Sequence, residues 1–161
     1  MSATYLVVGG GVVGSSIAWH LARRGAAVTL LEARSIAAAA SGASAGGVRQ
    51  QGRDPREMPL AIAAIARWEQ LEDELEADVH YYRNGHLQVY ESEEGVEAGK
   101  ISIVEQRALG LDIELVEGAA LRELAPGLSP HVIAGRYTAN DGHANPTLTT
   151  QAFANVAKRA G

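Results

Sequence analysis

Residues 8–16 read VGGGVVGSS and lie between a short apolar run and a stretch with periodic apolar residues. Three consecutive glycines disfavour both helix and strand, so they indicate a turn in which the backbone approaches something closely. Thr4–Val8 before them is rich in β-forming residues and predicts a buried strand. Val12–Arg24 after them has apolar residues at helical spacing and predicts a helix that ends at Gly25.

A second apolar run, Ala27–Leu31, ends at Glu32. Strand, glycine turn, helix and strand in this order form a βαβ unit within about thirty residues. We expect its two strands to be parallel and buried on both faces. The fold class predicted for this region is therefore α/β.

Gly9, Gly11 and Gly14 match the G-x-G-x-x-G pattern of dinucleotide-binding turns. Gly9 permits a tight turn, Gly11 leaves room for a pyrophosphate, and Gly14 lets the helix pack closely on the strand. The N-terminus of that helix offers free N–H groups and a positive dipole end to phosphates. Glu32 follows where a carboxylate accepts hydrogen bonds from ribose hydroxyls. The alternative is a glycine turn without a ligand, with Glu32 as a surface residue.

The type of dinucleotide depends on the residues around and after Glu32. Its carboxylate disfavours NADP, because it would repel a 2′-phosphate. Arg34 either weakens this repulsion or forms a surface ion pair with Glu32. An NAD domain should continue with another regular helix and strand, whereas residues 35–52 read SIAAAASGASAGGVRQQG. Small residues with Ser41 and Ser44 suit a segment lying along a large ligand, but the composition suits a disordered linker equally well.

The remaining sequence predicts a mixed second unit. Glu57–Ala77 predicts one long helix whose acidic outer face is solvated (Glu69, Glu72, Asp73 and Glu76). Asn84-Gly85 predicts a two-residue hairpin between HYYR and HLQVY. Further elements are expected as a helix from a Ser92 cap to about Leu109, strands at Asp112–Val116 and Val132–Tyr137, a short helix at Ala119–Ala125, and a last helix beginning at Asn145-Pro146.

Composition excludes several classes of function. The net charge of −5 and the scattered cations argue against nucleic acid as a partner. The chain has no cysteine, which excludes disulfides, iron–sulfur clusters, thiol catalysis and a cysteine-tethered flavin. The five histidines have no metal-ligand spacing, so no metal is expected. No signal peptide or apolar stretch long enough for a membrane span is recognisable, so we expect a cytoplasmic protein.

The run VVGGGVVGSSIAWHLARRGAAVTLLEAR followed by SGASAGGVRQQG resembles the N-terminus of the D-amino-acid-oxidase-like superfamily of FAD-dependent oxidoreductases. That superfamily includes glycine and sarcosine oxidases and the sarcosine and dimethylglycine dehydrogenases. NGHLQVY, LRELAPGL and DGHANPT extend the resemblance over the chain. It implies a Rossmann-like FAD-binding domain at 1–77, part of an α+β substrate domain at 78–140, and a helix at 141–161 that returns to the FAD domain.

The resemblance also implies which residues bind FAD. Gly9, Gly11 and Gly14, with Val12 and Val13 between them, match the pyrophosphate turn. Glu32 matches the ribose-binding acid, with Ala33 and Arg34 beside the adenosine. Ser41, Ser44, Ala45, Gly46 and Gly47 match the segment that lies along the pyrophosphate and approaches the flavin.

Arg49 is the one candidate near the flavin ring, where a cation would stabilise the reduced anionic flavin. The alternative is a guanidinium that is paired at the domain boundary. Some relatives attach FAD covalently through a histidine close to this segment. Ser44 occupies roughly that place here, so FAD is expected to bind non-covalently.

The activity implied is oxidation of the C–N bond of an amino acid or a related amine by hydride transfer to flavin. Superfamily members are much longer, so the resemblance implies an incomplete fold that needs a C-terminal half or another flavoprotein subunit. An NAD-dependent dehydrogenase domain and a non-catalytic fragment or subunit stay as alternatives. An exposed apolar face at the sheet would favour a fragment that needs a partner.

Overall fold

The computed structural model describes residues 4–161, which divide into two units. The first unit contains residues up to Gly47, Trp68–Tyr82 and His143–Gly161, and the second contains Val48–Arg67 and Arg83–Gly142. Residues 48–67, expected with the FAD-binding domain, thus group with the second unit. The assignment of the units to FAD binding and substrate binding stays a prediction.

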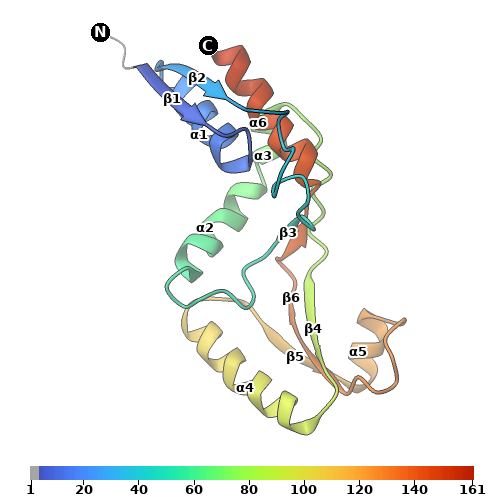
Figure 1. The fold of residues 1–161 in the computed structure, drawn as a ribbon. Helices are drawn as coiled ribbons and strands as arrows, with labels where there is room; N and C mark the ends of the chain where they lie inside the picture. The colour runs from blue at the N-terminus through green and yellow to red at the C-terminus, as the bar shows by residue number, and fades with distance from the viewer. Residues whose placement is uncertain (1–3) are drawn as a thin grey trace. The chain divides into compact units, whose positions relative to one another are not determined.

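The first unit contains the predicted βαβ arrangement (Figure 1). β1 (Thr4–Val8) and β2 (Ala27–Leu31) pair in parallel, with Thr4 opposite Ala27 and Val8 opposite Leu31. α1 (Val12–Ala22) joins them, and Gly25 takes a left-handed conformation with φ of +79° after the helix. Both strands have the bounds that the sequence predicts, and their parallel pairing is confirmed.

The expected burial of this sheet on both faces is wrong. Val7 points toward α1, whereas Leu6 and Val8 are 63% and 78% exposed and Leu31 is 50% exposed. Successive side chains of a strand point to opposite faces, so these three side chains belong to the face away from α1. Within the described residues of this unit, nothing buries that face of the two strands.

α6 (Pro146–Ala160) packs along α1 in the first unit (Figure 1). The rings of Trp19 on α1 and Phe153 on α6 lie 5.5 Å apart, and both side chains are buried. The helix begins as the sequence predicts, because the Asn145 side chain accepts a hydrogen bond from the Leu148 N–H at 3.0 Å and Pro146 follows it.

The long helix predicted at Glu57–Ala77 is wrong, since two helices stand in its place. α2 (Met58–Trp68) belongs to the second unit up to Arg67, and α3 (Leu71–Leu75) belongs to the first. Their buried side chains therefore contribute to different cores. Packing in two units overrides the continuous helical periodicity of the sequence.

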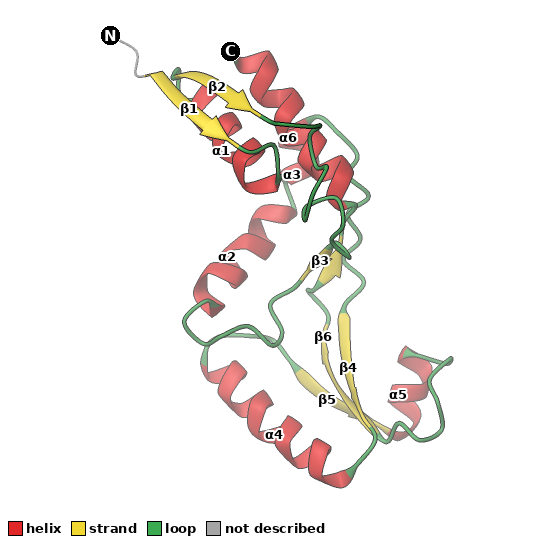
Figure 2. Cartoon of the chain, viewed as in Figure 1, coloured by secondary structure: helices red, strands yellow, loops and turns green. Residues whose placement is uncertain are grey.

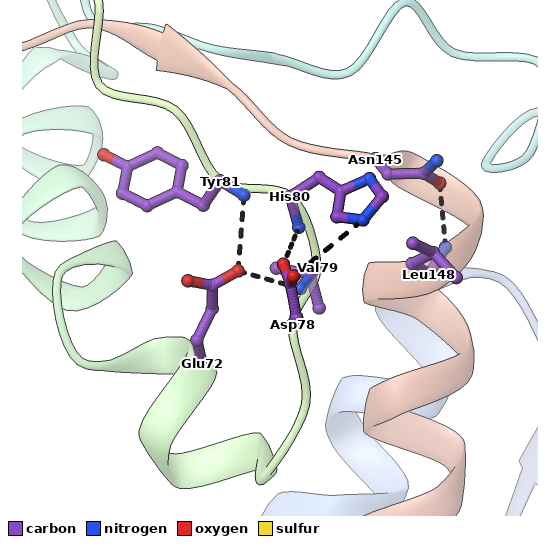
Figure 3. Close-up of polar contacts among 7 residues, drawn as sticks. All are labelled: Glu72, Asp78, Val79, His80, Tyr81, Asn145 and Leu148. Atoms are coloured by element: carbon purple, nitrogen blue, oxygen red, sulfur yellow. Dashed lines mark hydrogen bonds and ion pairs between the residues drawn. The ribbon is translucent and has the colours of Figure 1, made fainter.

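Glu72 is not part of a simply solvated acidic face. Its Oε1 accepts hydrogen bonds from the backbone N–H groups of Val79 at 2.8 Å and Tyr81 at 3.3 Å (Figure 3). The Asn145 N–H in turn donates to the Val79 carbonyl at 2.9 Å. Glu72 thus fixes the loop after α3 against the start of α6. Glu69, Asp73 and Glu76 are exposed, as expected.

The second unit is built on an antiparallel sheet of order β4-β6-β5 (Figure 2). Its strands are β4 (His86–Tyr90), β5 (Glu114–Glu117) and β6 (Ala134–Thr138), and its further helices are α4 (Glu93–Ala108) and α5 (Gly118–Leu124). A small apolar core contains Met58, Ile103, Leu111 and Ile113. Ser92 caps α4 by accepting a hydrogen bond from the Gly95 N–H at 3.2 Å, which confirms the predicted helix start.

The predicted hairpin at Asn84-Gly85 is wrong. Gly85 does form a turn, with φ of +85°, but β4 pairs with β6 and not with the residues before the turn. Tyr82 forms a bridge to His143 in the first unit instead. The turn therefore follows the point where the chain leaves the first unit and enters the second. The Asn-Gly dipeptide predicts a turn but does not show whether the segments on its two sides pair as a hairpin. The short strands β3 (Gly47–Val48) and β7 (Gly142–His143) pair with each other.

Candidate cofactor site

The middle glycine of the turn, Gly10, is buried beneath two side chains. A Cβ atom placed on Gly10 would lie 2.7 Å from Ile36 Cδ1 and 3.0 Å from the Glu32 Cβ. The Gly10 N–H donates to Glu32 Oε2 at 2.7 Å, and its carbonyl accepts from the Ala37 N–H at 3.0 Å. The turn is thus joined to the end of β2 and to the following loop. Sequence reasoning assigned no role to Gly10, although it lies between two motif glycines.

Gly9 and Gly14 give the turn its close geometry. Gly9 has a φ of +105°, a conformation that favours glycine. A Cβ atom on Gly14 would lie 2.0 Å from the Gly9 carbonyl oxygen and 3.4 Å from Val7 Cγ1. Position 14 therefore has room only for glycine where α1 passes β1.

The N-terminus of α1 presents hydrogen-bond donors at the surface. The Val12 N–H donates to Ser41 Oγ at 2.9 Å, and a Cβ atom on Gly11 would lie 3.0 Å from the same oxygen. Among the described residues, the N–H groups of Val13 and Gly14 have no acceptor. Val12 and Val13 are exposed. Free N–H groups with a positive helix-dipole end favour an anion such as a diphosphate.

The loop over residues 35–47 is folded onto the glycine turn. The Ala37 N–H donates to the Gly10 carbonyl, and Ser41 accepts from Val12. At the other end of the loop, Ser44 Oγ accepts from the Gly46 N–H at 3.1 Å, and the Gly46 carbonyl accepts from the Ala144 N–H at 2.9 Å. These contacts argue against the disordered linker that its composition also suited.

The same loop bears on the type of dinucleotide. Residues 33–46 form turns and bends and contain no helix, so the regular helix expected in an NAD domain is missing from this segment. Ala45 and Gly47 are exposed, and a Cβ atom on Gly46 would lie 2.1 Å from the Ala144 carbonyl oxygen. The loop therefore presents small side chains beside the glycine turn.

Glu32 is held in place by backbone donors. Its Oε2 accepts from Gly10, and its Oε1 accepts from the Arg34 N–H at 2.8 Å. These hydrogen bonds, above all that from Gly10, lower the pKa of Glu32 and favour its charged form. Each carboxylate oxygen has a second lone pair for a further donor, such as a ribose hydroxyl.

Arg34 does not form the surface ion pair with Glu32 that the sequence left open. Its guanidinium donates to the Ala38 carbonyl at 3.0 Å and so lies along the loop. Ala33, between Glu32 and Arg34, is exposed. The end of β2 therefore presents one charged carboxylate beside a small side chain, a surface that suits an adenosine ribose.

Arg49 belongs to the second unit, unlike the other predicted site residues. Its Nη1 donates to the Gln51 carbonyl, and no carboxylate lies within ion-pair distance of it among residues 4–161. The alternative of a paired guanidinium at the domain boundary therefore has no acidic partner in this part of the chain. Gln50, Gln51 and the buried Asp141 are neighbours that sequence reasoning missed, because no spacing pattern marks them.

Two negative results concern the described residues 4–161. They contain no group of three or more histidine, cysteine or acidic side chains that could hold a metal ion. None of the helices described there combines the length and the apolar character that crossing a bilayer requires. The candidate site rests on the donors of the glycine turn and on the carboxylate of Glu32, which fit the diphosphate and ribose of a dinucleotide.

Comparisons with known proteins identify the family of this chain. The family model of FAD dependent oxidoreductases matches residues 4–161. The glycine oxidase of Bacillus cereus ATCC 14579 has 32% identity and a TM-score of 0.89, over 100% of this chain and 45% of its own. The L-proline dehydrogenase of P. horikoshii has 32% identity and a TM-score of 0.89, over 99% of this chain and 42% of its own.

Relatives found by sequence similarity are also named as dehydrogenases or oxidases. Mitochondrial dimethylglycine dehydrogenase of Rattus norvegicus is 29% identical over 99% of this chain and 19% of its own length. An opine oxidase subunit of Rhizobium meliloti is 30% identical over 96% of this chain and 45% of its own. The chain thus spans about a fifth to under a half of the length of these relatives. With its turn, its acid and its match over nearly every residue, the chain belongs to the family of FAD dependent oxidoreductases.

Proposed function

We propose that this chain supplies the nucleotide-binding part of an enzyme that oxidises the C–N bond of an amino acid or a related amine with FAD. The observation that carries the proposal is the glycine turn, where the free N–H groups of Val13 and Gly14 lie next to Gly10, whose own N–H donates to the Glu32 carboxylate at the end of β2. Relatives named as glycine oxidase, proline dehydrogenase and dimethylglycine dehydrogenase support the substrate class.

In this proposal each part of the site has a separate role. The N-terminus of α1 binds the diphosphate, Glu32 accepts hydrogen bonds from ribose hydroxyls, and residues 44–47 lie along the cofactor. FAD, when bound there, would supply the redox chemistry, by accepting the hydride from the carbon beside the amine nitrogen. Non-covalent binding and a cytoplasmic location stay predictions.

We further propose that FAD binding and activity need polypeptide beyond the matched region, on the same chain or on another subunit. The relatives are more than twice as long as their matched parts. The apolar face with Leu6, Val8 and Leu31 is exposed, although parallel sheets are normally covered on both faces. A cavity of about 510 Å³ beside Val28 and Leu30 of β2 gives further apolar surface for such a segment.

The test is FAD titration followed by flavin fluorescence, on the protein together with the polypeptide that completes the enzyme, with Glu32→Gln as the site variant. Glu94→Gln, an exposed change at the start of α4, is the matched control. Wild-type protein and the control should bind FAD alike, and Glu32→Gln should bind it more weakly. Equal binding by all three would contradict the site, and binding of NAD in place of FAD would favour the dehydrogenase alternative.

Reduction of the bound flavin tests the substrate class. Glycine, sarcosine, dimethylglycine and proline are added without oxygen, and loss of the visible flavin absorbance is recorded. Reduction by at least one amine is expected when the polypeptide that completes the enzyme is present. A flavin that no amine reduces in that assembly would contradict the proposal.

That last outcome would favour a non-catalytic subunit, the second candidate function. One relative is named as the regulatory subunit of a mitochondrial phosphatase of Mus musculus and is 26% identical over 99% of this chain. The name of that relative is the observation that favours a non-catalytic subunit as the second candidate function.

A further inference from the structure

Arg136, on β6 of the second unit, is a buried arginine whose hydrogen-bond partners are all neutral; it is 8% exposed. Its Nε donates to Gln51 Oε1 at 3.0 Å, and its Nη2 donates to Gln88 Oε1 at 2.6 Å. Its Nη1 donates to Ser102 Oγ. No carboxylate lies within ion-pair distance of it among residues 4–161. Buried charges in proteins are normally paired, so this guanidinium is short of a counter-charge.

The guanidinium of Arg49, also in the second unit, is unpaired as well. Its Nη1 donates to the Gln51 carbonyl, and its other two nitrogens have no acceptor in the described part of the chain. A third cation follows closely, because Arg53 Nε donates to the Arg49 carbonyl at 3.3 Å. None of these arginines has an acidic partner among residues 4–161. The segment therefore carries positive charge that no neighbouring acid neutralises.

The guanidiniums of Arg49 and Arg136 approach one point at Gly52, which is exposed. A Cβ atom placed on Gly52 would lie 3.3 Å from Arg49 Nη1 and 3.5 Å from Arg136 Nη2. Apart from Gly52 and its chain neighbours, no other described heavy atom lies within 4 Å of that point. The Gly52 N–H donates to Gln106 Oε1 at 2.9 Å, which fixes the backbone there. An incoming group at this surface would thus contact two cations at once.

Asp141 is the acid whose charge must be set against these cations. It is fully buried, and its Oδ1 accepts from the Gln50 N–H at 2.8 Å and from Gln50 Nε2 at 3.1 Å. Its Oδ2 accepts from the Gln51 N–H at 3.0 Å. It lies beyond ion-pair distance of both guanidiniums and offsets one of their two charges. The charge that remains suits an anion with a single negative charge.

We propose that Arg49 and Arg136 form a binding site at Gly52 for the carboxylate group of a small organic acid or amino acid. A carboxylate has one negative charge and two oxygens in a plane, and guanidinium N–H groups bind it with favourable geometry. The site lies wholly within the second unit and takes no part of the cofactor. It goes beyond the proposed function, and it stands or falls independently of FAD binding.

The test uses the side chain of His86 as a reporter, with its titration followed by NMR. The charges of Arg49 and Arg136 lower the pKa of His86, so a carboxylate that neutralises them should raise this pKa. Acetate, proline and prolinamide are added separately, at constant ionic strength and without FAD, to the protein together with the polypeptide that completes the enzyme. Acetate and proline should raise the pKa of His86, and prolinamide, which lacks the carboxylate, should not.

Two results of this titration would overturn the inference. One is a His86 pKa that neither acetate nor proline changes, and the other is an equal shift with prolinamide. Inorganic phosphate is the further probe, and a larger shift at a lower concentration than acetate requires would overturn the assignment to a carboxylate. Tighter binding of proline than of acetate would identify an amino acid as the source of the carboxylate, and equal binding would identify the carboxylate group alone; either result supports the site.

Arg49→Gln removes one of the two cations and should abolish the shift that acetate causes. Arg56→Gln is the matched control, because Arg56 is an exposed arginine of the same unit that is paired with Asp54. The control should keep the shift. A shift of wild-type size in Arg49→Gln would overturn the inference. Arg136 is left unchanged, since the burial of its side chain makes loss of folding the expected effect of replacing it.

Gly52→Asp supplies a carboxylate from the chain itself, and Gly52→Asn is its uncharged control of the same shape. Gly52 has a φ of +73°, a conformation that Asp and Asn tolerate better than most side chains. Without added ligand, His86 should have a higher pKa in Gly52→Asp than in Gly52→Asn, and acetate should raise it no further in Gly52→Asp. Equal pKa values of His86 in the two variants would overturn the inference.

Discussion

Glu32 and Gly10 are joined by a hydrogen bond of 2.7 Å between the carboxylate Oε2 and the backbone N–H. The bond connects the end of β2 to the middle of the glycine turn, and it is the largest cause of the lowered pKa of Glu32. One carboxylate thus shapes the turn and presents a charge beside it. The position of Glu32 and the conformation of the glycine turn therefore depend on each other.

Glu32→Gln should weaken FAD binding roughly tenfold, because an amide group loses the charge and turns a donor toward Gly10 or Arg34. Flavin fluorescence titration measures the effect. Since the pKa of Glu32 is lowered below 4.5, the wild-type affinity should stay constant near neutral pH and fall only when acid protonates Glu32. An affinity that already falls with the titration of a group near pH 6.5 would assign the effect to histidine.

Gly14→Ala should destabilise the first unit and abolish FAD binding. The added Cβ would lie 2.0 Å from the Gly9 carbonyl oxygen, and a backbone atom cannot rotate out of the way as a side chain can. Such overpacking costs about 1–3 kcal/mol. The urea midpoint of unfolding measures it, with Gly127→Ala as control because nothing lies within 4 Å of a Cβ there. Equal midpoints in the two variants would show that the turn relaxes.

The βαβ unit was predictable because strand, turn and helix each carry a local signal. Thr4–Val8 and Ala27–Leu31 are apolar runs bounded by glycine or acid, and the bounds of both strands agree with the structure. Ser92 and Asn145 were predictable as caps for the same reason, since a cap is a contact within one turn.

Contacts between distant segments were not predictable. The break between α2 and α3, the direction of the chain at Gly85 and the burial of Asp141 all depend on which unit a segment joins. Periodicity and dipeptide signals report local conformation and contain no information on that choice. The exposed face of β1 and β2 has the same origin, because strand patterning shows that a face is apolar but not what covers it.

Glu72→Ala should destabilise the first unit, in contrast to what an exposed acidic helix face would imply. The change removes the acceptor for the Val79 and Tyr81 N–H groups. Hydrogen bonds to a charged group contribute about 1.5–3 kcal/mol each, so a clear fall of the urea midpoint is expected. Asp73→Ala, an exposed change on the same helix, is the control and should leave the midpoint nearly unchanged. Equal effects would show that Glu72 acts only through the charge of the helix.

His86 should make the second unit sensitive to acid. Its Nδ1 is buried and has no hydrogen-bond partner within residues 4–161. Burial is the largest cause that lowers the pKa of His86 from 6.5, and the charges of Arg49 and Arg136 lower it further, while Asp141 acts in the opposite direction. The folded unit therefore favours neutral His86 more than the unfolded chain does.

The sign of the pH dependence follows from this lowered pKa. Above pH 6.5 both states hold neutral His86, and its contribution to the free energy of unfolding is constant. As the pH falls from 6.5 toward the folded pKa, the unfolded chain binds the proton first and stability is lost. The protection factors of the amides in β4 and β6, corrected for the intrinsic exchange rate at each pH, should fall over that range, and His86→Gln should remove this fall. His131→Gln, at an exposed position, is the control and should keep it. A parallel fall in the wild type and in His86→Gln would assign the acid sensitivity to another group.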